Sequence, residues 1–101
     1  MNTRFEWDPA KAAGNLRKHR VSFEIAMRVF ADPFALTERD RIEGAEERWR
    51  TLGTVDGLVI LLVAHTLREE GDVEVIRIIS ARRAEPKERK RYEHAIRETL
   101  G

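Results

Sequence analysis

The pattern of apolar and polar positions predicts a short strand and two helices in the first third of the chain. Residues 5–7 are expected to be extended, and Asp8-Pro9 has the N-cap and first-turn signature of a helix that fades near His19. Ser22 caps a second helix, in which apolar residues recur at helical spacing until Asp32-Pro33 ends it.

In the rest of the chain, the pattern of apolar and polar residues predicts strands until a final helix begins at Pro86. Residues 47–55 and 58–67 flank Asp56-Gly57, which is a strong signal for a two-residue hairpin turn. The second of these strands is apolar on both faces, which indicates a central strand covered on each side. We expect a last strand at residues 73–81, a short edge strand at 34–37 before an acidic loop, and a final apolar helical line at Tyr92, Ile96 and Leu100.

These elements, in the order β-α-α-β-β-β-α, predict an α+β fold. We expect two N-terminal helices packed on one face of a three- to four-stranded antiparallel sheet, with a C-terminal helix covering part of the other face. Imperfect alternation in residues 47–55 assigns Trp49, Thr51 and Val55 to one face and Arg48, Arg50 and Thr54 to the other. A groove with a floor of strand residues and a wall of basic helix should stay open. The length of 101 residues fits a single domain, residues 1–101.

Composition excludes several classes of protein. The chain contains no cysteine, which excludes a disulfide framework, thiolate chemistry and a zinc ribbon. The N-terminus has no apolar h-region, and the longest apolar run, residues 58–64, is far shorter than the roughly 20 residues that a membrane-spanning helix needs. We therefore expect a cytoplasmic protein that does not enter a membrane.

Positive charge is concentrated in one stretch of the sequence. Residues 77–91 contain seven Lys or Arg and two Glu, a local balance of +5, although the whole chain carries a formal charge of +1. Residues 17–20 form a second basic cluster, and residues 38–47 have an acidic balance of −3. Any one of these charged clusters, taken alone, is explained as a surface that water solvates. Two basic clusters on separate elements instead favour binding to a polyanion such as nucleic acid.

Several short motifs occur in one order along most of the chain. They are Phe5-Glu6-Trp7-Asp8-Pro9, Asn15-Leu16-Arg17-Lys18-His19, Val21-Ser22-Phe23-Glu24, Phe30-Ala31-Asp32-Pro33, Leu52-Gly53, His65-Thr66, Arg77-Ile78-Ile79-Ser80-Ala81-Arg82, Glu88-Arg89 and Tyr92-Glu93. Together they resemble the BrnT family, whose members are toxins of type II toxin–antitoxin systems. Arg20 departs from this resemblance, because glycine is expected there and suits a left-handed helix end better.

The resemblance implies a RelE-like fold and a ribonuclease that inhibits translation and growth. It also implies neutralisation by a BrnA-type antitoxin of ribbon-helix-helix structure. We expect a heterotetramer of two toxins and two antitoxins, which contacts operator DNA only through the antitoxin.

Metal-free RNA cleavage can be argued from the residues themselves. The 2′-hydroxyl attacks the adjacent phosphate, so the site must accept a proton and stabilise extra charge on the phosphoryl oxygens. Histidine suits the first task and arginine the second. No spacing typical of a metal site, phosphate loop or nucleophile elbow is present. We therefore expect an endoribonuclease without metal or cofactor.

The candidate catalytic groups lie on the last two expected strands, which form a hairpin. We expect His65 to transfer a proton, and Arg77 and Arg82 to clamp the phosphate. Candidate RNA-binding residues around them are Lys18, Arg68, Ser80, Arg83, Lys87, Lys90, Arg91 and Tyr92.

Most of the candidates have a structural alternative, whereas a functional role is favoured for Ser80, Arg82 and Arg83 at an open strand end. His65 could be a hydrogen-bonded core histidine, and Arg77 could form an ion pair with Glu47 or Asp72. Arg68 could pair with Glu69 or Glu70, Lys18 could balance a helix dipole, Tyr92 could anchor the core, and the final helix could simply be solvated. At the level of function, the alternatives are a non-catalytic nucleic-acid-binding module and a protein-interaction domain.

The register of the hairpin at residues 58–81 decides whether His65 and Arg77 act together. If the numbers of facing residues sum to 142, the two side chains share a face of the sheet. If they sum to 141, the two side chains point to opposite faces. The turn sequence Arg68-Glu69-Glu70-Gly71-Asp72 permits either register.

Overall fold

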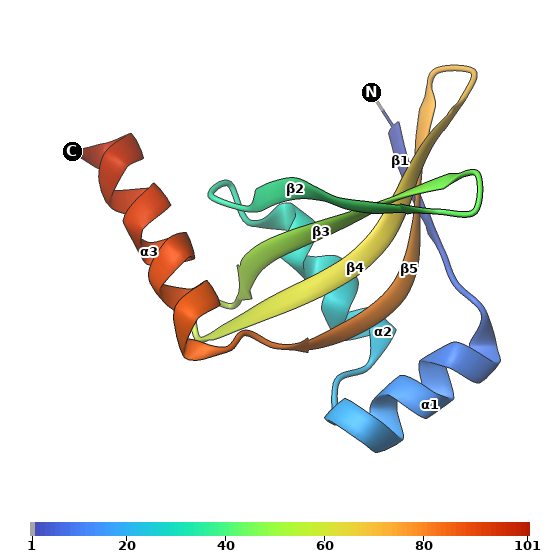
Figure 1. The fold of residues 1–101 in the computed structure, drawn as a ribbon, viewed down its shortest axis with the longest axis horizontal. Coiled ribbons are helices and arrows are strands. Elements are labelled where there is room, and N and C mark those ends of the chain that lie inside the picture. Colours follow the sequence, from blue (N-terminus) through green and yellow to red (C-terminus); the bar gives the residue numbers. More distant parts are fainter. Residues whose placement is uncertain (1) are drawn as a thin grey trace.

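A computed structural model describes residues 2–101 as a five-stranded sheet with helices on both faces (Figure 1). The strand order is β1-β5-β4-β3-β2. The elements are β1 (Asn2–Glu6), α1 (Pro9–His19), α2 (Phe23–Ala26), the 3₁₀ helix η1 (Met27–Ala31), β2 (Leu36–Glu43), β3 (Glu46–Val55), β4 (Val59–Glu70), β5 (Val73–Arg83) and α3 (Pro86–Leu100).

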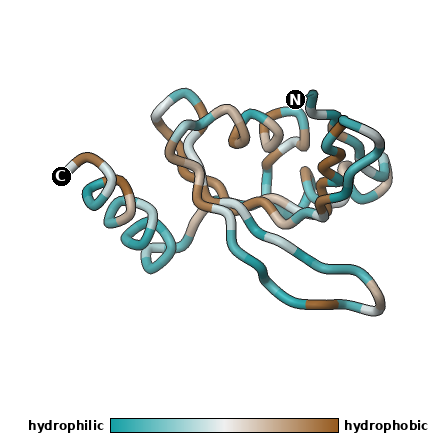
Figure 2. Tube along the Cα trace, turned by 90° about the horizontal axis from the view of Figure 1, so that it is seen from above, coloured by the Kyte–Doolittle hydropathy of each residue, from teal (hydrophilic) through white to brown (hydrophobic). Residues whose placement is uncertain are grey.

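The sheet differs from the predicted one in strand number and direction. It has five strands rather than three or four, and it is mixed, because β1 pairs in parallel with β5 while the other pairs are antiparallel. The expected acidic loop is instead the far end of β2 and the start of β3. Figure 2 shows this hairpin as a long, mostly hydrophilic projection. Its exposed polar residues offer no apolar alternation, so the hydrophobic pattern did not indicate a strand there.

The predicted helix starts are confirmed. The Asp8 Oδ1 atom accepts a hydrogen bond from the Ala10 N–H at 3.0 Å, and the Ser22 hydroxyl accepts one from Ile25 N–H at 3.1 Å. The helix that Ser22 caps is α-helical for one turn and continues as η1. At the end of α1, Arg20 has a φ of 62°, a conformation that glycine adopts with less strain.

Most of the core lies between the sheet and the N-terminal helices. Phe23, Val29, Val63 and Ile78 are fully or almost fully buried there. A close approach of η1 to the sheet depends on Gly53, because a Cβ atom at this position would lie 2.7 Å from Val29 Cγ1. The N-terminal helices therefore cover the middle of this face, as the apolar central strand predicted.

A side-chain amide fixes α1 to the edge of β5. The Asn15 Nδ2 group donates to the carbonyl oxygens of Val21 and Ala81 at 2.9 and 2.8 Å, and its Oδ1 atom accepts from the Ala81 N–H at 3.0 Å. β1 pairs with β5 only as far as Arg77, so the edge of β5 beyond that residue has no neighbouring strand. Asn15 supplies hydrogen bonds to the backbone N–H and carbonyl of Ala81 there.

α3 covers only one end of the opposite face. Tyr92 packs there with Leu52, Leu62 and Ala84 in a second, smaller core. The Tyr92 hydroxyl donates to Asp32, which also accepts a hydrogen bond from Thr54 N–H at 2.8 Å. Burial raises the pKa of Asp32, but these hydrogen bonds outweigh it and leave the pKa below its ordinary value. Within residues 2–101, no helix combines the length and apolar character needed to cross a membrane.

Candidate functional site

A β-bulge in β5 determines which arginines share a face of the sheet. Close to the turn Thr66 pairs with Arg77, whereas beyond the bulge Leu62 pairs with Arg82, and Ile79 is the additional residue. In a regular strand, Arg77 and Arg82 would point to opposite faces, because an odd number of positions separates them. The bulge therefore brings both guanidinium groups to the face that α3 leaves partly open.

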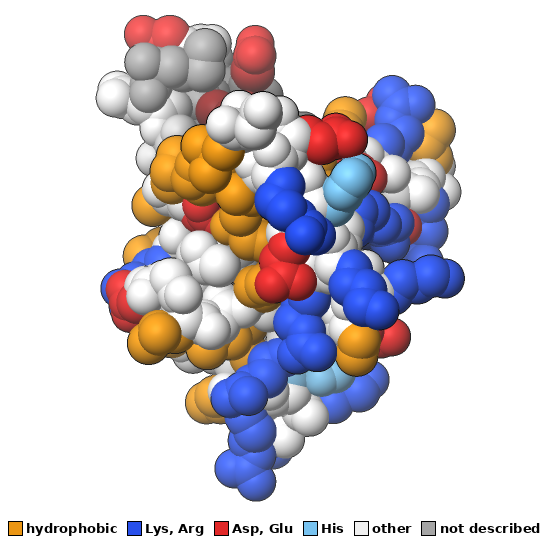
Figure 3. All heavy atoms as spheres, turned by 90° about the vertical axis from the view of Figure 1, so that its left-hand side faces the viewer, with side chains coloured by type: hydrophobic (Ala, Val, Ile, Leu, Met, Phe, Trp, Pro, Cys, Tyr) orange, Lys and Arg blue, Asp and Glu red, His pale blue; other side chains and the backbone are white. Residues whose placement is uncertain are grey.

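Arginines from three elements line this face. In its middle, Arg50 of β3, Ala64 of β4 and Ser80 of β5 lie side by side. The arginine face, as we call it, is formed by Arg48, Arg50, Ala64, Thr66, Arg77, Ser80, Arg82 and Arg91. Figure 3 views the molecule from the side where α3 lies and shows Lys and Arg side chains over the middle of this view, with further Lys and Arg side chains below them at the level of α1.

Arg77 has no ion-pair partner within residues 2–101. The sequence offered Glu47 and Asp72 as possible ion-pair partners of Arg77. Glu47 pairs with Arg39 instead, and Asp72 forms no ion pair within residues 2–101. Glu6 lies beside Arg77 in the sheet register, but its carboxylate binds Arg68 at 2.6 Å. Arg77 is half-buried, so its charge is only partly hydrated and is available to an incoming anion.

Arg82 is held by a carboxylate of α3. Its two terminal nitrogens donate to the two oxygens of Glu88 at 2.9 and 3.0 Å. This bidentate hydrogen bond lowers the pKa of Glu88. Glu88 also accepts from the Glu85 N–H as part of the capping box that begins α3. Arg82 therefore connects β5 to α3, and only part of its hydrogen-bonding capacity remains for a ligand.

Arg50 and Arg91 converge on a single carboxylate. Glu38 of β2 accepts from Arg91 at 2.7 Å and lies 3.7 Å from Arg50. The Nε atoms of Arg48, Arg50 and Arg91 are buried, and each lacks a hydrogen-bond partner within the described residues. These Nε atoms are closed to solvent, but the side chains of Arg50 and Arg91 are 35% and 40% exposed, so a ligand can approach both residues.

Arg68 belongs to a neutral cluster at the edge of the same face. It binds Glu6 at 2.6 Å and Glu70 at 2.8 Å, and Glu70 also binds Arg4 at 2.7 Å. The hydrogen bond from Arg68 lowers the pKa of Glu6. The expected structural alternative, pairing with Glu70, is present. Two cations and two carboxylates cancel here, so this cluster adds no net charge to the arginine face.

His65 is enclosed in the core on the opposite side of the sheet. Its exposed fraction is 0%, and its ring packs edge-on against Phe30 with 5.0 Å between centroids. The Thr66 carbonyl can only accept, so His65 Nδ1 carries the proton of that 3.2 Å hydrogen bond. His65 Nε2 then accepts from the Thr51 hydroxyl at 2.7 Å. Burial lowers the pKa of His65 from 6.5 to about 4, so the ring is neutral near pH 7.

Both expected hairpin registers are wrong. His65 faces Ile78, a sum of 143, and the sum changes to 144 at the bulge. The cause is a two-residue turn at Gly71 and Asp72, which makes Glu70 face Val73. His65 and Arg77 therefore point to opposite faces and do not form a pair. In this conformation the imidazole does not reach a phosphate bound at the arginine face, which favours the core-histidine alternative.

The other candidate residues are divided among several locations. Ser80 lies on the arginine face, and Lys87 and Lys90 are exposed on α3 beside it. Arg83 pairs with Leu61 and points to the helix-covered face, and Lys18 lies in the last turn of α1, away from the site. Tyr92 is a core anchor with 3% of its surface exposed.

Arg48 and Arg50 belong to the site but were not among the sequence candidates. The imperfect alternation of residues 47–55 had placed both on the face opposite Trp49 and Thr51, and the structure confirms this placement. They were missed because a strand arginine is indistinguishable from a solvated residue until its neighbours across the sheet are known. Within residues 2–101, no group of three or more His, Cys, Asp or Glu side chains could hold a metal ion.

Comparisons with known proteins agree with this architecture. The family model described as "Ribonuclease toxin, BrnT, of type II toxin-antitoxin system" matches residues 7–88. The 1.1 Å crystal structure of the Brucella abortus ribonuclease toxin BrnT is similar in fold, with a TM-score of 0.59 and 23% sequence identity. That match covers 84% of this chain and 99% of the Brucella chain. No curated protein matches the sequence.

Proposed function

The chain belongs to the BrnT family of ribonuclease toxins of type II toxin–antitoxin systems, and from this premise we propose that its arginine face binds RNA and cuts it without a metal ion. The observation that carries the proposal is the bulge at Ile79, which sets Arg77, Ser80 and Arg82 on one face beside Arg50. A bulge that redirects side chains in this way is common next to active sites.

The proposed reaction is attack of the 2′-hydroxyl on the adjacent phosphate. The 2′-oxygen forms a bond to phosphorus, the bond to the 5′-oxygen breaks, and the products are a 2′,3′-cyclic phosphate and a 5′-hydroxyl. Arg77 binds the phosphoryl oxygens and stabilises the charge that develops on them, since its guanidinium has no carboxylate partner within residues 2–101. Arg50 and Arg82 position the flanking phosphates.

His65 lies in the core and not at the arginine face, so we assign it no proton transfer. In the proposed mechanism the rate enhancement comes from electrostatic stabilisation of the charge on the phosphoryl oxygens. We assign the proton of the 2′-hydroxyl to water, and the proton that the leaving 5′-oxygen receives also comes from water. Metal independence follows from the same argument, since the arginines supply the positive charge that a metal ion would otherwise provide.

The cellular consequence that we propose is arrest of translation and growth through loss of RNA. The type II family implies a protein antitoxin. We propose a BrnA-type ribbon-helix-helix antitoxin, assembled as two toxins on an antitoxin dimer and contacting operator DNA only through the antitoxin. Light scattering of the purified complex, coupled to gel filtration, measures the stoichiometry directly, and a mass other than that of two toxins and two antitoxins contradicts the assembly.

Cleavage of a labelled single-stranded RNA by the purified toxin in EDTA tests the proposed reaction. We expect cleavage to continue in EDTA and to yield cyclic phosphate ends. A matched RNA with 2′-O-methyl groups at the cut positions should bind with similar affinity and stay intact, because the nucleophile is blocked. Cleavage of the methylated RNA, or loss of cleavage in EDTA, contradicts the proposed chemistry.

The burial of His65 favours a second candidate, a nucleic-acid-binding module that does not cut. The same arginine face would bind phosphates, and no imidazole would be needed. The two candidates differ in one observable. The binding module holds RNA with a salt-dependent affinity and leaves its length unchanged after long incubation, whereas the ribonuclease shortens it.

A further inference from the structure

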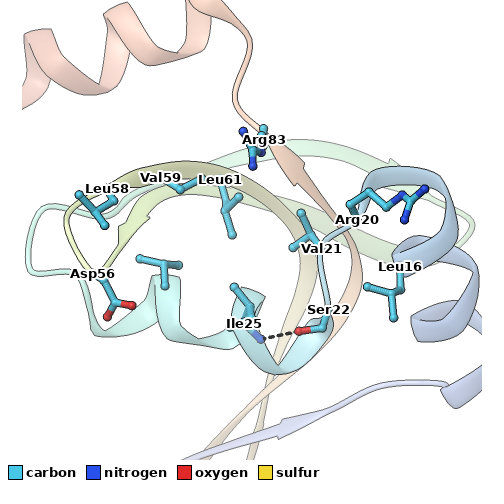
Figure 4. A pocket seen from close by; sticks show the side chains of 11 residues that line it. Leu16, Arg20, Val21, Ser22, Ile25, Asp56, Leu58, Val59, Leu61 and Arg83 are labelled. Atoms are coloured by element: carbon cyan, nitrogen blue, oxygen red, sulfur yellow. Dashed lines mark hydrogen bonds between the residues drawn. The ribbon is translucent and has the colours of Figure 1, made fainter.

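An apolar groove lies on the helix-covered side of the sheet, separate from the arginine face. It is bounded by the end of α1, by α2 and by the turn between β3 and β4, and it has a volume of about 330 Å³ (Figure 4). Leu61 and Val59 of β4 line it, together with Leu16 and Ile25 from the helices.

The groove exposes apolar side chains that the fold leaves uncovered. Leu58 is 85% exposed, Leu16 is 48% exposed and Ile25 is 41% exposed. Exposed leucine or isoleucine side chains are ordinary when they are scattered singly, but three around one hollow form a contiguous patch. Such a patch is typical of a protein-binding site.

Cations border this apolar patch. Arg20 and Arg83 both line the groove, and neither forms an ion pair within residues 2–101. The carboxylate at the groove, Asp56, is already bound by Arg28. The uncompensated charge at the rim is therefore positive, and a complementary partner needs apolar residues flanked by carboxylates.

We propose that this groove binds an apolar segment of the antitoxin that carries acidic residues on its flanks. The inference rests on the proposed function, since the family implies that a protein antitoxin binds this toxin. A second copy of the chain fits less well. A twofold contact would place Arg20 and Arg83 of one copy close to the same cations of the other, and like charges repel.

The placement of the groove separates antitoxin binding from RNA binding. Arg82 and Arg83 are neighbours in β5 but point to opposite faces, one to the arginine face and one to the groove. An antitoxin anchored in the groove can therefore reach the arginine face around this end of the sheet. Changes confined to the groove should weaken antitoxin binding and leave the RNA reactions of the isolated toxin unchanged.

Two single substitutions test the proposal, Leu58→Asp for the apolar patch and Arg83→Glu for the charge of the rim. Both side chains are exposed, so folding should be unaffected. Ile42→Asp is the matched control, because Ile42 is 62% exposed on the β2–β3 hairpin and does not line the groove. Affinity for the purified BrnA-type antitoxin proposed above is measured by calorimetry with full-length proteins.

We expect each groove variant to bind the antitoxin at least about tenfold more weakly, as central interface positions typically do, with the control within about twofold. RNA cleavage by each variant alone should equal that of the parent. Parental antitoxin affinity in both groove variants overturns the inference. So does a concentration-dependent dimer of the parent toxin that Leu58→Asp abolishes in sedimentation. If the parent does not cut RNA but the variants still lose the antitoxin, the proposed reaction fails and the groove assignment stands.

Discussion

The burial of His65 predicts a specific loss of stability between pH 6.5 and pH 4. In the native protein its pKa is about 4, and in the unfolded chain it has the ordinary value of 6.5. Below pH 6.5 the unfolded chain therefore binds a proton that the native ring does not. The stability that neutral His65 provides is complete above pH 6.5 and is lost as the pH falls toward 4.

The size of this loss follows from the two pKa values. Their separation corresponds to about 3 kcal/mol for the complete titration, and to about 2 kcal/mol of it by pH 5. The carboxyl groups of Asp32, Glu6 and Glu88 have lowered pKa values, so their contributions are lost only below their ordinary values of 3.8 and 4.5. Between pH 6.5 and pH 5, the predicted change comes mainly from His65.

Urea denaturation at pH 7.5 and pH 5 measures this change directly. The control is His65→Gln, which cannot titrate in this range and should lower the free energy of unfolding at pH 7.5 by about 1–3 kcal/mol through lost hydrogen bonding. Its stability should then be nearly the same at both pH values. An equal decline in parent and control, or no decline in the parent, would refute the assignment of His65 to the core.

Three further predictions concern the arginine face and α3. Glu38→Gln removes the carboxylate that competes for Arg50 and Arg91, and should raise RNA affinity by about fivefold in a filter-binding assay; unchanged or weaker binding contradicts this competition. Replacing exposed Lys87 and Lys90 together with Ala should weaken binding to all RNA sequences and flatten the salt dependence by about 0.7–0.9 for each phosphate that is no longer neutralised, whereas an unchanged slope means that α3 does not touch RNA. Tyr92→Phe removes the hydroxyl bound to Asp32 and should reduce the free energy of unfolding in urea by about 1–2 kcal/mol, and no change would mean that this hydrogen bond does not hold α3.

Local signals in the sequence predicted much of the fold. Asp8, Ser22 and Pro86 mark helix starts, because capping depends on a few adjacent residues. Asp56-Gly57 marks a hairpin, although its loop includes Leu58 and so has three residues rather than two. The first part of β2 was expected only as a short edge strand. Its extension to Glu43 depends on pairing with β3, which composition does not reveal.

The site was harder to predict, because it depends on register. The choice of Arg77 and Arg82 as phosphate-binding groups required that both side chains share a face, and only the bulge at Ile79 makes this possible. Nothing in the apolar pattern of β5 indicates the bulge. His65 was chosen because its titration suits catalysis, but strand parity and its apolar surroundings decide its environment. Residue type indicated the chemistry, while pairing determined which residues can take part in it.

The cleavage rate of Arg77 variants tests the central claim most directly. Arg83 provides a matched control, since it is an arginine on the same strand that points to the opposite face. Under single-turnover conditions with the isolated toxin, Arg77→Ala should cut RNA about 10²–10³-fold more slowly, as expected for a lost transition-state donor. Arg77→Lys should not restore the rate, because an ammonium group cannot bind two oxygens in one plane. Arg83→Ala should cut at the parent rate. Cleavage at the parent rate by folded Arg77→Ala would contradict the account and place the reaction elsewhere on the molecule.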